Sequence, residues 1–198
     1  TTLAAPDLDP ETARIEVDQK LWWSPEGLLV ITTTVRPEVD VVSLPRVGLV
    51  LELPRSFGEL HWYGRGPHEC YPDRQRGARL GWWHDDVGAL PTPYERPQES
   101  GARTDVRWAV LSGPEGALLS VLRPDGGPLQ VGTAPCRPQA LAGLGHQHEI
   151  TASGTTVLHL DAAHCGLGNA SCGPGVLPPY LVAPERVTFT VALLATLH

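Results

Sequence analysis

Short runs in which apolar and polar residues alternate recur along almost the whole chain, and turns rich in Gly and Pro separate them. A period of two residues is the pattern of a β-strand with one buried face, and no segment sustains the 3.6-residue period of an amphipathic helix. We expect strands at 13–19, 28–35, 47–53, 60–63, 106–111, 117–122, 129–131, 156–161 and 187–193. The pattern predicts an all-β fold, an antiparallel β-sandwich with long ordered loops.

The chain has 198 residues, which suits one domain with a sizeable core. Apolar residues make up 41% and charged residues 19%, as in ordinary globular proteins. We expect a single domain over residues 1–198, with a loose N-terminal end at 1–10 and the sandwich over 15–198. A short helical turn is expected within 138–144.

The formal net charge of −7 argues against a nucleic-acid partner, because binding to phosphates needs clustered positive charge. Arg74, Arg76 and Arg79 form the one basic cluster in the sequence. We interpret this cluster as a network of ion pairs and carbonyl bonds rather than a phosphate site. No apolar run approaches the roughly 18 residues of a membrane span, so no membrane partner is expected.

The four cysteines are Cys70, Cys136, Cys165 and Cys172, and they lack the C-x-x-C pairs of a zinc ribbon. Two disulfides, with three possible connectivities, are one alternative. Because no secretory signal is visible, we favour free thiols and a cytoplasmic location. The chain contains no Met, so we expect a processed product or a piece of a longer protein.

Residues 60–108 hold four of the six tryptophans and show little strand or helix periodicity. A segment this rich in aromatic, Arg, Gly and Pro residues is not a flexible linker, because linkers lack aromatic residues. We interpret it as an ordered functional loop, held by buried rings and by arginines that donate to carbonyls and carboxylates.

Five motifs lie in or after this segment: Trp62-Tyr-Gly-Arg-Gly-Pro-His-Glu69, Tyr71-Pro-Asp-Arg74, Pro97-Gln-Glu99, Arg103-Thr-Asp-Val-Arg-Trp108 and Ser171-Cys-Gly-Pro174. With Pro93-Tyr94 and Pro178-x-Tyr180, they resemble the C-terminal domain of large β-galactosidases of glycoside hydrolase family 2, known as the small-chain or fifth domain. The resemblance covers roughly residue 15 to the C-terminus.

The resemblance implies a galactose mutarotase-like supersandwich that is incomplete at its N-terminus. It places the two catalytic carboxylates in a separate barrel domain, so this chain alone is expected to be inactive and to bind no cofactor. The full-length enzyme is expected to hydrolyse terminal β-D-galactosides such as lactose, to be retaining, and to hold a divalent metal ion such as Mg with ligands outside this chain. Missing strands leave exposed sheet edges, which predicts a homo-oligomer.

Glu69 and Glu99 are the candidate carboxylates for a glycosidase mechanism, since retaining enzymes use two carboxyl groups about 5–5.5 Å apart. We interpret Glu69 as structural, either accepting from backbone N–H groups or pairing with an arginine of the loop. Asp85 and Asp86 are interpreted as a solvated turn. No catalytic residue is therefore expected in this chain.

Two sets of residues have the chemistry of metal ligands. His146 and His148 share a face if the segment is extended, with Glu149 beside them. We favour one histidine packed on the long loop and one exposed. The second set is His164, Cys165 and Cys172, which could form a soft-metal site. We favour a Gly-rich loop with free cysteines there.

Residues 166–174 are the best candidate for contact with substrate. The resemblance implies that the matching loop reaches from this domain into the active site of the barrel and presents a Trp that stacks on the sugar beyond the galactose. Cys172 stands at that position here, and Cys lacks the flat apolar surface that stacking needs. We expect Asn169, Ser171 and Cys172 to line the mouth of the site and leave a more open subsite for the leaving sugar.

Two other functions stay open. In a free-standing carbohydrate-binding module, Trp22-Trp23 and Trp82-Trp83 would stack on sugars, with alternation burying one ring of each pair and exposing the other. A mutarotase-like epimerase rests on the implied fold alone and needs a positioned acid and base, which the sequence does not nominate.

Overall fold

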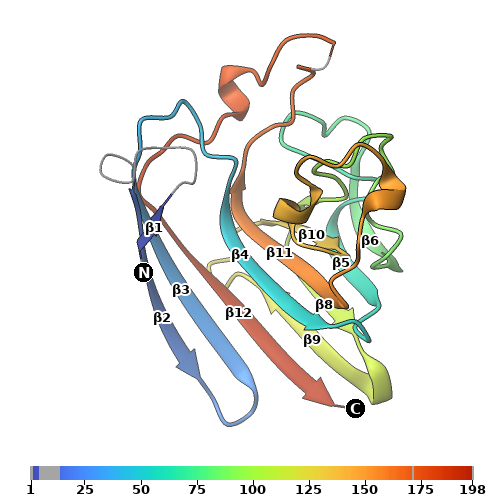
Figure 1. Cartoon of the computed structure of the whole chain (residues 1–198). Coiled ribbons are helices and arrows are strands. Elements are labelled where there is room, and N and C mark those ends of the chain that lie inside the picture. The colour runs from blue at the N-terminus through green and yellow to red at the C-terminus, as the bar shows by residue number, and fades with distance from the viewer. Residues whose placement is uncertain (1, 5–13, 171, 198) are drawn as a thin grey trace.

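The computed structural model describes residues 2–4, 14–170 and 172–197. Within these ranges the chain forms twelve strands and four short 3-10 helices, with no α-helix. The strands make two sheets that pack face to face around a hydrophobic core (Figure 1). All pairings of neighbouring strands are antiparallel, which confirms the prediction of an all-β antiparallel sandwich.

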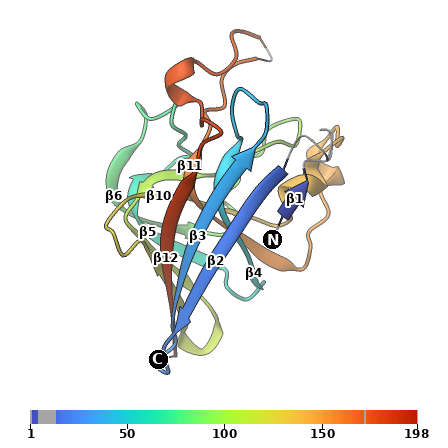
Figure 2. The ribbon, with the colours of Figure 1, turned by 90° about the vertical axis from the view of Figure 1, so that its left-hand side faces the viewer.

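The larger sheet has eight strands in the order β1-β2-β3-β12-β9-β8-β5-β6. Their bounds are β1 Thr2–Ala4, β2 Arg14–Trp23, β3 Leu28–Glu38, β5 Glu59–Gly66, β6 Arg79–Asp86, β8 Trp108–Ser112, β9 Ala117–Leu122 and β12 Val187–Leu197. The last strand, β12, lies between β3 and β9, so the C-terminal segment joins the two halves of the sheet (Figure 2).

The smaller sheet has four strands in the order β4-β11-β10-β7. Their bounds are β4 Arg46–Pro54, β11 Thr155–His164, β10 Leu129–Ala134 and β7 Arg103–Val106. The pairing of β11 with β4 shifts register between Asp161 and Ala163, which marks a β-bulge.

The core fills the space between the sheets with the inward-facing residues of both. Trp62 of β5, Val191 of β12 and Leu158 and Leu160 of β11 are buried there. Alternation explains why these residues are the buried ones, because every second residue of a strand faces the same side of its sheet. The apolar positions of the predicted strands therefore define the core.

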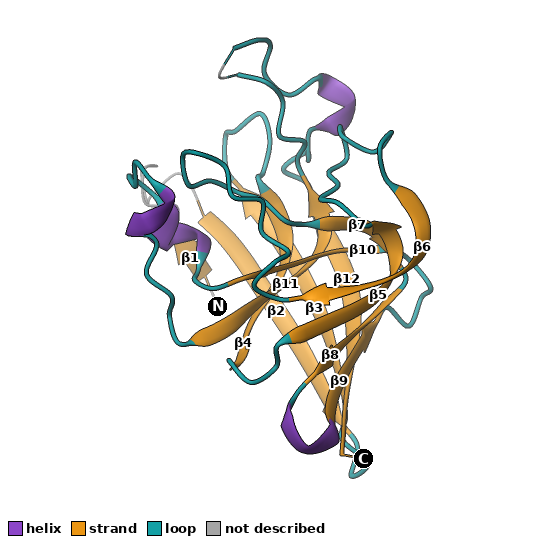
Figure 3. Ribbon diagram, turned by 90° about the vertical axis from the view of Figure 1, so that its right-hand side faces the viewer, coloured by secondary structure: helices purple, strands orange, loops and turns teal. Residues whose placement is uncertain are grey.

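Long loops form a further layer on the outer face of the smaller sheet (Figure 3). Gln130, His159 and Asp161 point away from the core on β10 and β11, and all three are nevertheless buried. The 3-10 helices Pro138–Leu141 and Gln147–Glu149 belong to this layer, whereas Pro114–Gly116 and Pro178–Tyr180 lie elsewhere. Pro138–Leu141 is the short helical turn expected within 138–144.

The central segment is more regular than the sequence predicts. It contains β6 and β7 in addition to β5, although residues 60–108 show little periodicity. β6 is an edge strand whose side chains are mostly exposed, so it carries no clear apolar alternation. Of the expected loose end at 1–10, the structure describes Thr2–Ala4, which pair with β2 as β1, and the other residues lie outside the described ranges.

Among the described residues, no strand pairs with the outer edge of β2 over residues 18–23. β1 pairs with residues 14–16 of β2. Leu21, Trp22 and Trp23 are 65%, 57% and 66% exposed, so the expectation that one of the two tryptophans is buried is wrong. The smaller sheet does not cover β2, so facing inward does not bury a side chain there.

In the described ranges no helix has the length and apolar character needed to cross a membrane.

Candidate functional site

The projecting loop, residues 166–174, follows β11 and extends beyond the strand ends at the top of Figure 1. Asn169 and Cys172 are exposed at its tip. The N–H groups of Cys172 and Gly173 both donate to the carbonyl oxygen of Asn169, at 2.9 and 2.7 Å. The structure thus brings two of the three predicted site residues together, and the third, Ser171, lies outside the described residues.

The base of the projecting loop is fastened to the Tyr71-Pro-Asp-Arg74 motif. The Asp73 carboxylate accepts from the N–H groups of Leu167 at 3.1 Å and Gly168 at 2.7 Å. The Arg74 guanidinium donates to the Gly168 carbonyl oxygen at 2.8 Å. Gly168 has a φ of +63°, and a Cβ there would lie 2.7 Å from the backbone nitrogen of Val176. The loop is therefore held at its base, and Asn169 and Cys172 are exposed at its tip.

Glu69 has the structural role that the sequence predicts. Its carboxylate accepts hydrogen bonds from the Thr92 hydroxyl at 2.8 Å, from the Gly101 N–H at 2.9 Å and from the Tyr94 hydroxyl. These bonds join residue 69 to residues 92–101, two parts of the central segment that lie far apart in the sequence. The carboxylate is thus occupied in holding the loop.

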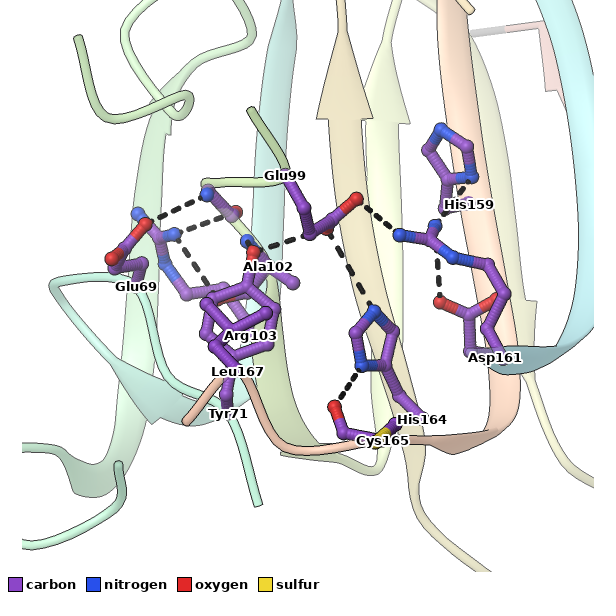
Figure 4. A network of polar contacts seen from close by, with 12 residues as sticks. Glu69, Tyr71, Glu99, Ala102, Arg103, His159, Asp161, His164, Cys165 and Leu167 are labelled. Carbon is purple, nitrogen blue, oxygen red and sulfur yellow. Dashed lines mark hydrogen bonds and ion pairs between the residues drawn. The ribbon is translucent and has the colours of Figure 1, made fainter. Parts of the chain in front are cut away.

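A second group of ionisable side chains, which we call the polar cluster, lies on the outer face of the smaller sheet. Its members are Arg46, Glu99, His159, Asp161 and His164. Figure 4 shows Glu99, His159 and Asp161 around one guanidinium, that of Arg46. Arg46 pairs with Glu99, lies 3.0 Å from His159 Nδ1, and lies 3.6 Å from Asp161 Oδ2.

The bulge in β11 assembles this cluster. His159 and Asp161 oppose Val50 and Gly48 on β4 and share the outer face. After the register shift, His164 opposes Arg46 and lies on that face too, whereas regular alternation would turn it inward. Gly48 makes room for the carboxyl group, since a Cβ there would lie 2.3 Å from Asp161 Oδ1.

Burial changes the protonation of the cluster. Desolvation raises the pKa of Asp161 to about 7, with Arg46 opposing the rise. Desolvation and the nearby Arg46 charge lower the pKa of His159 to about 4, and burial lowers the pKa of His164 as well. Both histidines are therefore neutral near pH 7, and the Asp161 carboxyl group is close to its midpoint.

Tyr71 links the polar cluster to the central loop. Its hydroxyl donates to Glu99 Oε1 at 3.0 Å and accepts from the Ala102 N–H at 3.4 Å, and its ring lies 5.4 Å from that of His164. Burial, together with the Glu99 charge, raises the pKa of Tyr71, so the hydroxyl stays protonated as a donor.

The predicted arginine network exists, but other arginines form it. Arg76 and Arg79 are exposed, and of the three predicted residues Arg74 alone bonds to a loop carbonyl. The network uses two half-buried arginines, Arg46 and Arg65, and the buried Arg103. Arg65 donates to Asp105 at 2.5 Å, and Arg103 donates to the Gly101 carbonyl oxygen at 2.7 Å. Spacing in the sequence does not reveal which arginines turn inward.

The two candidate metal sets are not gathered into sites. His146 and His148 stack on each other with ring centroids 5.5 Å apart, and both are exposed, so the expectation that one packs on the long loop is wrong. Among the residues that the structure describes, no three His, Cys, Asp or Glu side chains are placed to hold a metal ion together. All four cysteines are free thiols, as expected. Asp85 and Asp86 are exposed but end strand β6, where the sequence predicts a turn.

The sequence analysis names Glu99 and His164 in other roles, but it does not predict that they join Arg46, His159 and Asp161 in the polar cluster. The available signal was the alternation in 156–161, where His159 and Asp161 fall on one face of a strand whose other face is apolar. Alternation alone marks those positions as solvent-facing, because the loops that cover them belong to distant parts of the chain.

The comparisons with known proteins agree on one family. The model of the beta galactosidase small chain matches residues 4–193. β-Galactosidases from Arthrobacter sp., Vibrio cholerae and Priestia megaterium are 38%, 35% and 33% identical over 76%, 78% and 72% of this chain. The chain spans about 15% of the length of these relatives.

A putative aldose 1-epimerase from Escherichia coli K12 is similar in structure, with 11% identity over 100% of this chain and 68% of its own, at a TM-score of 0.41. The match over residues 4–193 and the agreement of the relatives show that this chain belongs to the β-galactosidase small-chain family.

Proposed function

We propose that this chain is the non-catalytic C-terminal domain of a retaining β-galactosidase that hydrolyses terminal β-D-galactosides such as lactose. The observation that carries the proposal is the projecting loop, which Asp73 and Arg74 fasten at its base while Asn169 and Cys172 stay exposed at its tip. A loop built in this way presents its tip to a neighbouring domain in a fixed position.

The carboxylates of the central segment support a non-catalytic role. Glu69 is occupied by Thr92, Tyr94 and Gly101, and Glu99 by Arg46 and Tyr71. A nucleophile or acid/base needs a free face toward the sugar. We therefore assign the two catalytic carboxylates to another part of the parent protein.

The partners follow from this role. The catalytic barrel and other domains of the parent would cover part of this domain, and the galactoside would meet the loop tip. A divalent ion such as Mg would find its ligands in those other domains. We also propose a cytoplasmic location and a homo-oligomer, the latter supported by the open edge of β2.

The test uses the parent enzyme and its Cys172→Trp variant. A Trp at the loop tip would supply the flat surface that Cys lacks, so the variant should bind the leaving sugar several-fold more tightly. Inhibition of hydrolysis by free glucose measures that affinity, and Val42→Trp, at an exposed position of another loop, is the control. Equal inhibition of wild type and Cys172→Trp would remove the loop from the active-site mouth.

A second candidate function is carbohydrate binding by the larger sheet. Trp82 is 75% exposed, and its ring lies 4.8 Å from that of Trp108 and 5.6 Å from that of Tyr63. These three rings come from β6, β8 and β5 and form an aromatic platform of the kind that stacks on sugars. Titration of this chain with β-galactosides, followed by Trp fluorescence in wild type and Trp82→Ala, separates a sugar platform from an interdomain surface.

A further inference from the structure

We propose that the cavity above the polar cluster is a binding site for a small neutral polyol, such as a single pyranose sugar. The cavity lies between the outer face of the smaller sheet and the loops that cover it, and its volume is about 290 Å³. This volume is at the lower end of small-molecule pockets, so it suits one sugar ring better than a larger ligand. Gly88, Gln98 and Pro135 on its rim are exposed, which leaves it open to solvent.

The floor of the cavity is more polar than expected for a sheet face that is merely covered by loops. Arg46, Glu99, His159 and Asp161 all line it and come from β4, the central loop and β11. A loop layer that only covered a sheet would be stabilised best by apolar side chains, because each buried ionisable group costs desolvation free energy. Four such groups at one concave surface point to a ligand that they bind.

Asp161 supplies an independent observation. It is 2% exposed and lines the cavity, and its Oδ1 has no hydrogen-bond partner among the described residues. Buried carboxyl oxygens are nearly always hydrogen-bonded, so this one lacks a donor; it lies against Gly48, and a ligand reaches it when the carboxyl group turns toward the cavity. A sugar hydroxyl is a donor that fits, because it also accepts a bond from a guanidinium or an imidazole beside the carboxyl group.

The charges of the cluster favour a neutral ligand. Arg46 pairs with Glu99 and lies near Asp161, so one cation faces two carboxyl groups, and the two histidines add no charge near neutral pH. An anion would meet Glu99 and Asp161, and a cation would meet Arg46. A neutral polyol is repelled neither by the two carboxyl groups nor by the guanidinium.

The opposite wall suits the apolar side of a sugar ring. The cavity is lined by Pro91, Pro93 and Pro97 of the central loop and by Leu141 and Ile150 of the loop between β10 and β11. Such a wall can contact the C–H groups of a pyranose while its hydroxyls face the polar floor. The class of ligand follows from these residues, and the choice of galactose as the first probe rests on the proposed function.

The test is titration of this chain with D-galactose, D-glucose, galacturonate and galactosamine by calorimetry. We expect a neutral sugar to bind with a dissociation constant near or below about 1 mM. Asp161→Asn keeps the shape of the side chain and should weaken binding at least tenfold, whereas Asp40→Asn, at an exposed position, should not change it. Thermal unfolding of each variant shows that it is folded.

A second variant guards against misfolding of Asp161→Asn. Ala134→Leu narrows the cavity without altering the polar cluster and should also abolish binding. The proposal is overturned if no neutral sugar binds, if galacturonate or galactosamine alone binds, or if Trp82→Ala rather than Asp161→Asn abolishes binding. A failure here leaves the β-galactosidase role standing, because that role is tested by hydrolysis and inhibition in the parent enzyme.

Discussion

The carboxylate of Asp73 accepts a hydrogen bond of 2.7 Å from the backbone N–H of Gly168, across 95 residues of sequence. The bond joins the Tyr71-Pro-Asp-Arg74 motif of the central segment to the projecting loop, so two segments far apart in the sequence are parts of one structure. The order of one loop therefore depends on the other.

Asp73→Ala should loosen the base of the projecting loop. Hydrogen bonds to a charged group contribute about 1.5–3 kcal/mol each, so exchange of the Leu167 and Gly168 amides should become at least about tenfold faster. Hydrogen exchange by NMR measures this. Asp125→Ala is the matched control, since the Asp125 carboxylate also accepts from a backbone N–H, that of Gly127, in a different turn. Unchanged exchange at Leu167 and Gly168 would show that Asp73 does not hold the loop.

The pH dependence of unfolding should reveal Asp161 and His159 separately. The pKa of Asp161 is raised to about 7, so between about pH 4 and 7 the folded state binds the extra proton and stability falls as pH rises. The pKa of His159 is lowered to about 4, so between about pH 4 and 6.5 the unfolded state binds the extra proton and stability rises with pH. In the wild type the two contributions oppose each other.

Substitution should separate these two contributions. In Asp161→Asn, the free energy of unfolding should rise with pH between 4 and 6.5, at up to about 1.4 kcal/mol per pH unit from His159, with His164 acting in the same direction. In His159→Gln, the decrease due to Asp161 should be more evident between pH 5 and 7. The charges of Arg46 and Glu99, which act on both His159 and Asp161, are retained in both variants. Urea unfolding at several pH values measures the slopes, and identical slopes in the two variants would contradict the assignment.

Arg103→Lys should destabilise the domain. The guanidinium of Arg103 is buried, donates to the Gly101 carbonyl oxygen at 2.7 Å, and lies 5.3 Å from the centre of the Trp62 ring. A lysine lacks the planar fork that makes both contacts, so we expect a loss of about 2–4 kcal/mol. Arg107→Lys, at an exposed position four residues later, should change stability by less than about 0.5 kcal/mol. Equal losses in urea unfolding would refute a special role for Arg103.

The open edge of β2 should make the isolated chain self-associate. Leu21 and Trp23 share the inward face of the larger sheet with their partners Ile31 and Leu29, yet both are exposed, because the smaller sheet does not extend over β2. The double variant Leu21→Lys and Trp23→Lys should shift the chain toward monomer in sizing with light scattering, because charged residues disfavour edge pairing and apolar contact. Val42→Lys replaces an exposed apolar residue outside the strands and should have no effect. A wild type that is monomeric throughout would exclude this association.

The sequence predicts most of the sandwich because its strands alternate clearly, as in β3, β5 and β12. It does not predict β6, whose edge position leaves most of its side chains exposed and removes the pattern. The role of Glu69 could be predicted, since a carboxylate in a loop rich in donors is expected to bind them.

The polar cluster could not be predicted for a physical reason. His159 and Asp161 alternate as outward-facing residues should, and loops from elsewhere in the chain bury them. His164 joins them through a bulge, which shifts a side chain from one face to the other without a signal in the residues themselves. The cluster therefore depends on tertiary contacts and on the bulge. Strand periodicity predicts the sheet beneath the cluster but not the cluster itself.

The central claim is that this domain supports galactoside hydrolysis without performing it. The most direct measurement compares hydrolysis of o-nitrophenyl β-D-galactoside by the 198-residue chain and by the parent enzyme at equal molar concentration. We expect turnover by the parent enzyme and none above background by the 198-residue chain alone. Turnover by the chain alone, abolished by Glu69→Gln or Glu99→Gln, would contradict it.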